Sequence, residues 1–210
     1  MDKLEMEYAW TSFHCSSSIK NFKEKLQRKL KVPEYSCSRD REKNVLFVGM
    51  YHWKDYFRVA FHSGRCTIFW CGSDILNLKN RKWAQNILRS KRIDHICENK
   101  VERLYLTLMD IDARIEQWLF DDPGKYQVCY KHSNTPRVFA TYHKGREEEY
   151  GYFEHPQIDW FCDLPEEEFN EKIKSYQGCI RLNKFDGFAE SLAKSVLMGQ
   201  YQWSEIPYPY

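Results

Sequence analysis

The amino-acid sequence predicts an α/β fold made of two small Rossmann-like domains with mostly parallel sheets. Short apolar, β-branched or aromatic runs alternate with amphipathic stretches through most of the chain, which is typical of βα units. A turn-rich segment near the middle coincides with a change in charge balance. The length of 210 residues, of which 42% are hydrophobic and 16% aromatic, allows one domain or two small ones.

Four apolar runs in the first half predict strands: 44–51 (NVLFVGMY), 66–72 (CTIFWCG), 93–98 (IDHICE) and 113–120 (ARIEQWLF). Amphipathic stretches between them predict a short helix that ends at Gly64, one basic helix after Ser73 and Asp74, and a helix capped by Asn99. The opening segment, EYAWTSF and then SSSIKNFKEKLQRKL, predicts one more strand and helix.

Residues 121–126 (DDPGKY) have turn chemistry, and we place the domain boundary there, between domains 1–120 and 121–210. Beyond it, strands are predicted at 137–143 (RVFATYH), 158–162 (IDWFC) and 178–183 (GCIRLN). The helices are expected in REEEYGYFE, in PEEEFNEKIKSY with Pro165 in its first turn, and in GFAESLAKSVLMG, which Gly199 ends.

The net charge of +2 conceals an asymmetry between the two halves. Residues 1–120 carry +7 and residues 121–210 carry −5. The cations of the first half form two clusters: Lys20, Lys23, Lys25, Arg28, Lys29 and Lys31, and then Lys79, Arg81, Lys82, Arg89, Lys91 and Arg92. Such clusters predict an anionic partner for the first half, and two solvated helix faces are the alternative interpretation.

The composition excludes several classes of protein. No window approaches the ~18 apolar residues of a membrane span, and the acidic N-terminus differs from a signal peptide, so we expect a cytoplasmic protein without an integral membrane segment. Eight cysteines stand singly, without CxxC pairs, which favours reduced thiols over structural zinc. The motifs GxxxxGK[ST], GxSxG and HExxH are absent, which argues against kinase-like, hydrolase and zinc-protease chemistry.

The stretch CIRLNKFDGFAESLAKSVLMGQYQW resembles the donor-site region of nucleotide-sugar glycosyltransferases with two facing Rossmann-like domains, the GT-B fold. In that family a strand leads to an acidic residue, a Gly-Phe or similar pair, and a helix that ends in Gly. Asp186, Gly187, Phe188 and Gly199 fall on those positions. The resemblance implies that a glycine-bearing turn at a helix N-terminus binds the donor diphosphate through backbone N–H groups.

Further segments support this resemblance, which covers most of residues 44–205. Gly145 and Arg146 after RVFATYH match a Gly-Arg pair in which the family's Arg contacts the pyrophosphate. The segments FVGMYHWKDY, IFWCGSD and IDHICENKVERLYL resemble strand-loop-helix units of the acceptor domain. We also expect Arg181 to contact the donor, although a salt bridge at the sheet edge is the alternative.

The sequence also departs from the family. Lys194 occupies the place of the second acidic residue, which usually binds the donor ribose, so ribose recognition must differ or Lys194 contacts phosphate. Tyr150 and Gly151 stand roughly where a Lys-Gly pair is common. The second half has about 90 residues and lacks the usual closing helices, which predicts a minimal version of the fold.

Candidate catalytic groups lie in loops after first-half strands, because ligands gather at the carboxyl ends of parallel strands. His52 and Asp55 follow one strand, Asp74 the next and Glu98 a third. For an inverting transfer, Asp55, Asp74 or His52 is the candidate base, whereas a retaining transfer requires none. The alternatives are a helix cap for Asp74, a loop residue for His52 and a first-turn acid for Glu98.

The sequence thus predicts a compact cytoplasmic glycosyltransferase that moves a sugar from a nucleotide-diphosphate donor to a hydroxyl. The donor residues are Arg146, Arg181, Asp186, Gly187, Phe188 and Lys194. The basic first half, the absence of a membrane anchor and the small size favour 5-hydroxymethylcytosine in phage DNA as the acceptor, with Trp10, Trp53 and Trp83 as stacking candidates. A cell-surface glycan or lipid acceptor and a non-catalytic binding protein remain alternatives, and no obligatory metal is expected because no DxD-type pair lies near the donor motif.

Overall fold

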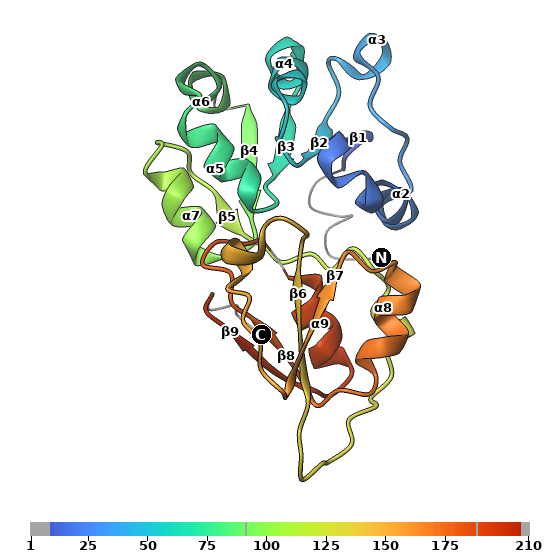
Figure 1. Ribbon diagram of the computed structural model, residues 1–210. Coiled ribbons are helices and arrows are strands. Elements are labelled where there is room, and N and C mark those ends of the chain that lie inside the picture. Colours follow the sequence, from blue (N-terminus) through green and yellow to red (C-terminus); the bar gives the residue numbers. More distant parts are fainter. Residues whose placement is uncertain (1–8, 91, 188, 207–210) are drawn as a thin grey trace. The chain divides into compact units, whose positions relative to one another are not determined.

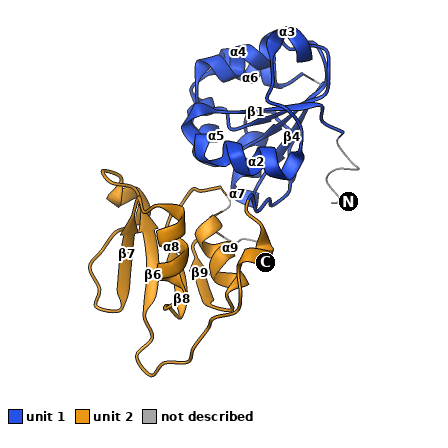
Figure 2. Cartoon of the chain, turned by 90° about the vertical axis from the view of Figure 1, so that its right-hand side faces the viewer, with its two compact units in different colours: residues 1–120 blue, residues 121–210 orange. Residues whose placement is uncertain are grey.

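The computed structural model describes residues 9–90, 92–187 and 189–206. The chain divides into two compact units, Met1–Phe120 and Asp121–Tyr210 (Figure 2). Each unit contains one parallel sheet with helices packed on it. The predicted class, α/β with two small Rossmann-like domains, is therefore confirmed.

The sheet of unit 1 has five parallel strands in the spatial order β1-β2-β3-β4-β5 (Figure 1). Their bounds are β1 Ser12–Cys15, β2 Val45–Val48, β3 Cys66–Phe69, β4 Ile93–Cys97 and β5 Arg114–Ile115. An isolated parallel bridge joins Phe13 to Glu34 on the free edge of β1. There Phe13 N–H donates to the Pro33 carbonyl (3.1 Å) and Tyr35 N–H donates to the Phe13 carbonyl (2.7 Å). Residues 33–35 thus act as a rudimentary further strand.

This edge segment gives unit 1 a topological switch point. From β1 the chain runs through η1 (Ser17–Phe22) and α2 (Lys23–Leu30) to the outer edge, then through α3 (Cys37–Asp40) back past β1 to β2. Right-handed crossovers in opposite directions place their helices on opposite faces of a sheet. The loops that follow β1 and β2 consequently diverge, and ligands bind at such a divergence in open α/β sheets.

The remaining helices of unit 1 are α4 (Trp53–Phe61), α5 (Ser73–Lys79), α6 (Lys82–Leu88) and α7 (Lys100–Thr107). The basic helix predicted after Ser73 is in fact two helices. The Gln85 side chain donates to the Leu78 and Lys79 carbonyls, both at 3.1 Å, and so satisfies the end of α5 where the chain turns. Asn99 caps α7 as predicted, by accepting the Glu102 N–H (3.0 Å).

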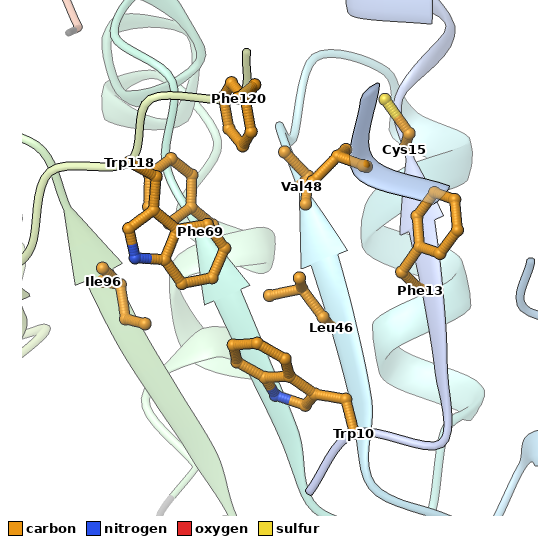
Figure 3. Packing of buried hydrophobic residues seen from close by; sticks show 10 residues of the cluster. Trp10, Phe13, Cys15, Leu46, Val48, Phe69, Ile96, Trp118 and Phe120 are labelled. Carbon is orange, nitrogen blue, oxygen red and sulfur yellow. The ribbon is translucent and has the colours of Figure 1, made fainter. Parts of the chain in front are cut away.

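The core of unit 1 explains why the predicted strand 113–120 is mostly irregular. Only Arg114–Ile115 pair with β4, and the apolar residues that follow pack on the sheet instead. The Trp118 ring stacks on Phe69 with centroids 4.3 Å apart, and Trp10 meets Trp118 edge-on at 5.5 Å (Figure 3). The end of the predicted strand is apolar because Trp118 and Phe120 belong to the hydrophobic core. Leu26 of α2 packs in the same core.

Unit 2 has four parallel strands in the order β7-β6-β8-β9. The strands are β6 Val138–Tyr142, β7 Ile158–Cys162, β8 Gly178–Arg181 and β9 Tyr201–Ser204, and the helices are η2 Pro123–Lys125, η3 Glu147–Tyr150, α8 Glu166–Ile173 and α9 Glu190–Leu197. Its core is separate and includes Phe139, Ile173, Cys179, Leu192 and Met198. Because β6 lies between β7 and β8, the switch point of this sheet lies between β6 and β8.

Local chemistry sets the helix ends in unit 2. Pro165 is the N-cap of α8 rather than a first-turn residue, and α9 begins at Glu190 rather than at Gly187. Gly199 has φ +74°, and the Gln200 N–H returns to the Ser195 carbonyl (2.9 Å). A left-handed glycine directly after a helix ends it in this way, as the sequence predicts.

Candidate functional site

The switch point of unit 2 brings together side chains from β6, β8 and the loop before α9. Arg181, the last residue of β8, donates from Nε to Asp186 Oδ2 (2.7 Å), and its Nη2 also contacts that oxygen. Its Nη1 donates to Thr141 Oγ1 near the carboxyl end of β6. The guanidinium therefore spans the two strands that flank the switch point. Only 12% of the Arg181 side chain is exposed.

Two arginine side chains lie near the ring of the buried residue Tyr150. The Arg181 guanidinium lies 5.2 Å from the centre of the Tyr150 ring, and that of Arg146 lies 5.8 Å from it. Burial raises the pKa of Tyr150, against the two arginines, which lower it. Arg146 is exposed and pairs with Glu149, which raises the pKa of its guanidinium. We call Arg146, Tyr150, Arg181 and Asp186 the arginine cluster.

Asn183 and Gly187 lie close in sequence to Arg181 and Asp186. Asn183 is buried, and its Oδ1 has no hydrogen-bond partner among the residues that the structure describes. Asn183 is not among the site residues predicted from the sequence, although its place two residues after a strand end is a usable signal. Gly187 is buried at the turn that leads to α9, and Phe188 lies outside the described residues.

Lys194 does not belong to the arginine cluster. Its ammonium donates to Glu166 Oε1 (3.0 Å) and to Asn170 Oδ1 (3.1 Å), both on α8, and 4% of its side chain is exposed. The rings of Tyr126 and Phe169 lie 5.7 Å from its Nζ. Lys194 therefore joins α9 to α8, and the structure does not group it with the other predicted donor residues.

At the switch point of unit 1 a buried carboxylate organises the loops after β1 and β2. Asp55 is 2% exposed and accepts hydrogen bonds from His14 Nε2 (2.9 Å), Ser16 Oγ (2.7 Å) and His52 N–H (2.9 Å). Burial alone would raise the pKa of Asp55, but these three donors outweigh it and hold the pKa below its usual value. Asp55 thus ties α4 to the end of β1.

His52 and Ser18 are exposed residues of the segments that follow β2 and β1. His52 Nε2 lies 2.9 Å from Ser18 Oγ, and both residues face solvent. His52 is the N-cap of α4, and its backbone is fixed by Asp55. Of the three predicted catalytic residues, His52 alone presents its side chain to solvent.

The Asp74 side chain is fully buried and bonds to backbone N–H groups. It is 0% exposed and accepts the N–H groups of Met50 (2.9 Å), Cys71 (3.1 Å) and Ile75 (3.0 Å). Burial raises the pKa of Asp74 to about 7, against these donors, which lower it. The carboxyl group therefore fastens the loops after β2 and β3, and proton exchange with a substrate would require those loops to open.

The other residues singled out in unit 1 fall into two groups. Glu98 is buried at the end of β4, and its N–H donates to Glu102 Oε2 (2.6 Å), so it belongs to the start of α7. Trp10 is buried and donates from Nε1 to Thr67 Oγ1 (3.0 Å), which makes it a core residue. Trp53 and Trp83 are exposed.

No protein-family model matches this chain, and no curated protein matches its sequence. All eight cysteines are free thiols. Within residues 9–90, 92–187 and 189–206 there is no group of three His, Cys, Asp or Glu side chains arranged to hold a metal ion. No helix in that same part of the chain is long and apolar enough to cross a membrane.

Proposed function

We propose that the protein is a cytoplasmic glycosyltransferase that binds a nucleotide-diphosphate sugar in unit 2 and transfers the sugar to a hydroxyl group held by unit 1. The observation that carries this proposal is the arginine cluster at the switch point of a parallel sheet. Planar guanidinium groups bind phosphate oxygens in a bidentate manner, and switch points are where nucleotides bind in this architecture.

The proposed donor chemistry follows from the geometry of the cluster. Asp186 accepts a hydrogen bond from the Arg181 guanidinium and holds it in one orientation. Because the side chain is already ordered, little of its conformational entropy is lost when a phosphate binds. Arg146 adds a second cation at the exposed rim, and Asn183 Oδ1 is an acceptor for a donor hydroxyl. Two cations stabilise the negative charge that develops on the leaving diphosphate.

On the acceptor side we assign the proton-accepting role to His52 if the transfer inverts the sugar. Its imidazole is exposed, is close to Ser18 and is held on a backbone that Asp55 fixes. Asp55 and Asp74 act as positioning residues in this proposal because their oxygens are occupied by the protein's own donors. A retaining transfer would use no such base.

Two acceptor classes have support. Hydroxymethylated bases in DNA, as in phages, suit the +7 charge of residues 1–120, because phosphate contacts require cations. A glycan or lipid at a membrane suits the exposed aromatic residues Trp53 and Trp83 beside exposed cations. A binding protein that has lost catalysis would keep the fold without either reaction.

Donor binding is tested by thermal unfolding with a panel of nucleotide-diphosphate sugars. One donor should raise the melting temperature of the wild type, because it binds only the folded state. Arg181→Ala should weaken the binding of that donor by roughly 10-fold or more. Arg137→Ala is the matched control, since Arg137 directly precedes the amino end of β6, away from the carboxyl end where the arginine cluster lies, and pairs with Asp159. An equal response in both variants would contradict the proposed donor site.

Transfer is tested with the donor so identified. The protein is incubated with hydroxymethylcytosine DNA or with lipid and glycan acceptors, and the products are analysed by mass spectrometry. A mass gain of one sugar, lost in His52→Ala for an inverting reaction, supports the proposed chemistry. Donor binding without transfer to any acceptor, or no binding at all, would favour the non-catalytic alternative.

A further inference from the structure

One helix of unit 1 exposes a continuous row of aromatic rings. Trp53, Phe57 and Phe61 lie four residues apart on α4 and are 58%, 42% and 64% exposed. Trp83 of α6, 43% exposed, extends the row sideways, because its ring lies 5.6 Å from that of Phe57. We call these four residues the aromatic stripe. An exposed apolar patch of this kind in a folded domain indicates a contact surface.

The exposed charges on the stretch of chain that carries the aromatic stripe are cationic, although Asp94 and Asp110 pair with two of its arginines, Arg65 and Arg89. Residues 53–92 contain nine Lys and Arg residues but only two acids, Asp55 and Asp74. Both acids are buried, so the solvent-facing ionised groups in this stretch of the described chain are cationic. Lys54, Lys79 and Lys82 are exposed, and the Lys54 ammonium lies 5.7 Å from the Trp53 ring centre. The excess of exposed cations beside exposed rings favours a partner that is both apolar and anionic.

Ring packing distinguishes between the two anionic partners, nucleic acid and lipid. Phe57 is stacked by Phe61, with centroids 6.1 Å apart and an interplanar angle of 22°, and is also met by Trp83. Trp53 is met edge-on by Phe57 and carries Lys54 over its ring. Bases that stack require free ring faces, whereas a bilayer requires only a contiguous apolar surface with cations at its rim.

The charge also disfavours a second copy of the same surface. A symmetric dimer brings identical patches together, and here that would place the exposed lysines of both copies in one interface. A helix with Trp and Phe on one face and Lys or Arg beside it matches the chemistry of helices that lie in the membrane interface.

We propose that the α4–α6 surface docks on an anionic lipid bilayer. The aromatic stripe enters the boundary between headgroups and acyl chains, and Lys54, Lys79 and Lys82 contact lipid phosphates. This inference goes beyond sugar transfer and does not depend on it. Combined with the proposed sugar transfer, docking on a bilayer favours an acceptor displayed on a membrane over one in DNA.

The test measures cosedimentation of the full chain with vesicles of phosphatidylcholine alone or with about one third phosphatidylglycerol. Binding should require the anionic lipid and weaken as salt rises from about 0.1 M to about 0.5 M. Phe57→Ala/Phe61→Ala and Lys54→Glu/Lys82→Glu should each reduce binding roughly 10-fold or more. The control is Leu104→Ala/Leu108→Ala, which removes two exposed leucines, one from α7 and one from its C-cap, and should leave binding unchanged. Circular dichroism and melting temperature confirm the fold of each variant.

Three outcomes would overturn the proposal. Equal vesicle binding by the wild type and the Phe57/Phe61 variant would show that the stripe does not insert. Absence of binding to either vesicle by the wild type would exclude a bilayer partner. Loss of binding to single-stranded or duplex DNA in the same variants, without vesicle binding, would assign the surface to nucleic acid. None of these readouts uses a nucleotide sugar, so they are independent of the donor experiment.

Discussion

At the scale of single residues, the two buried aspartates of unit 1 show how burial changes the role that an acidic side chain can play. Asp55 and Asp74 both follow strands, and the sequence makes both of them candidate bases. In the structure each accepts hydrogen bonds from three donor groups of the protein itself. Both side chains join the loops that follow the strands, and neither presents its carboxylate to solvent.

Asp55→Asn should destabilise the protein by about 2 kcal/mol near pH 7, because a buried charge-assisted hydrogen-bond network loses its anion. The pKa of Asp55 is lower in the folded than in the unfolded chain. Its stabilising effect is therefore complete above the unfolded carboxyl pKa of about 4 and disappears as the pH falls through the folded pKa. The difference between wild type and variant should thus shrink at about pH 3.

Urea unfolding at the two pH values measures this difference. Asp94→Asn is the matched control, since Asp94 forms an exposed pair with Arg65 at 3.5 Å and its loss should change stability by less than about 0.5 kcal/mol. Equal effects of the two substitutions near pH 7 would contradict the assigned role of Asp55.

At the scale of elements, α8 and α9 show how a residue can fall on a family position and serve another purpose. Lys194 stands where the resembled family carries an acid, but it lies under α8 and pairs with Glu166. Lysine suits this place because its long apolar stem crosses the buried contact between the helices and its ammonium reaches the half-exposed carboxylate.

A charge swap tests this pairing. Lys194→Glu should destabilise the protein by about 1–3 kcal/mol, because two carboxylates then meet at a partly buried contact. Adding Glu166→Lys should recover much of that loss. The same swap at Lys172 and Glu168, an exposed pair on α8, should be nearly neutral and serves as the control. A double variant no more stable than Lys194→Glu, measured by urea unfolding, would show that the pair does not join the helices.

At the scale of the whole molecule, the chain builds two cores that share no residue. The core of unit 1 lies on a five-stranded sheet and that of unit 2 on a four-stranded one. Each unit has about 90 to 120 residues, which is within the usual range for a domain that folds on its own hydrophobic core.

We expect the two cores to respond separately to mutation. Ile68 and Ile173 are fully buried, one in each unit. Replacing either by Val removes one methylene and should cost about 1 kcal/mol, or roughly 4–8 °C in the melting temperature of a domain of this size. Calorimetry should show that Ile68→Val shifts one transition and Ile173→Val another. A single transition that both substitutions shift equally would show that the units unfold together.

The sequence by itself determined the α/β class and most strands and helices, because apolar runs, caps and turn residues act locally. It identified β7 at 158–162, the Asn99 cap and the glycine that ends α9. It also predicted Arg181 and Asp186 as donor residues, a role that stays a prediction, but it contained no signal that Arg181 and Tyr150 lie together.

Only the tertiary structure decided the rest, because contacts between distant residues leave no local pattern. The pairing of residues 33–35 with β1 creates the switch point of unit 1, although this segment lacks an apolar run. The turn between α5 and α6 depends on the Gln85 side chain, and the partner of Lys194 lies 28 residues away. The spacing of Trp53, Phe57 and Phe61 is visible in the sequence, but packing alone determined that this face of α4 is exposed.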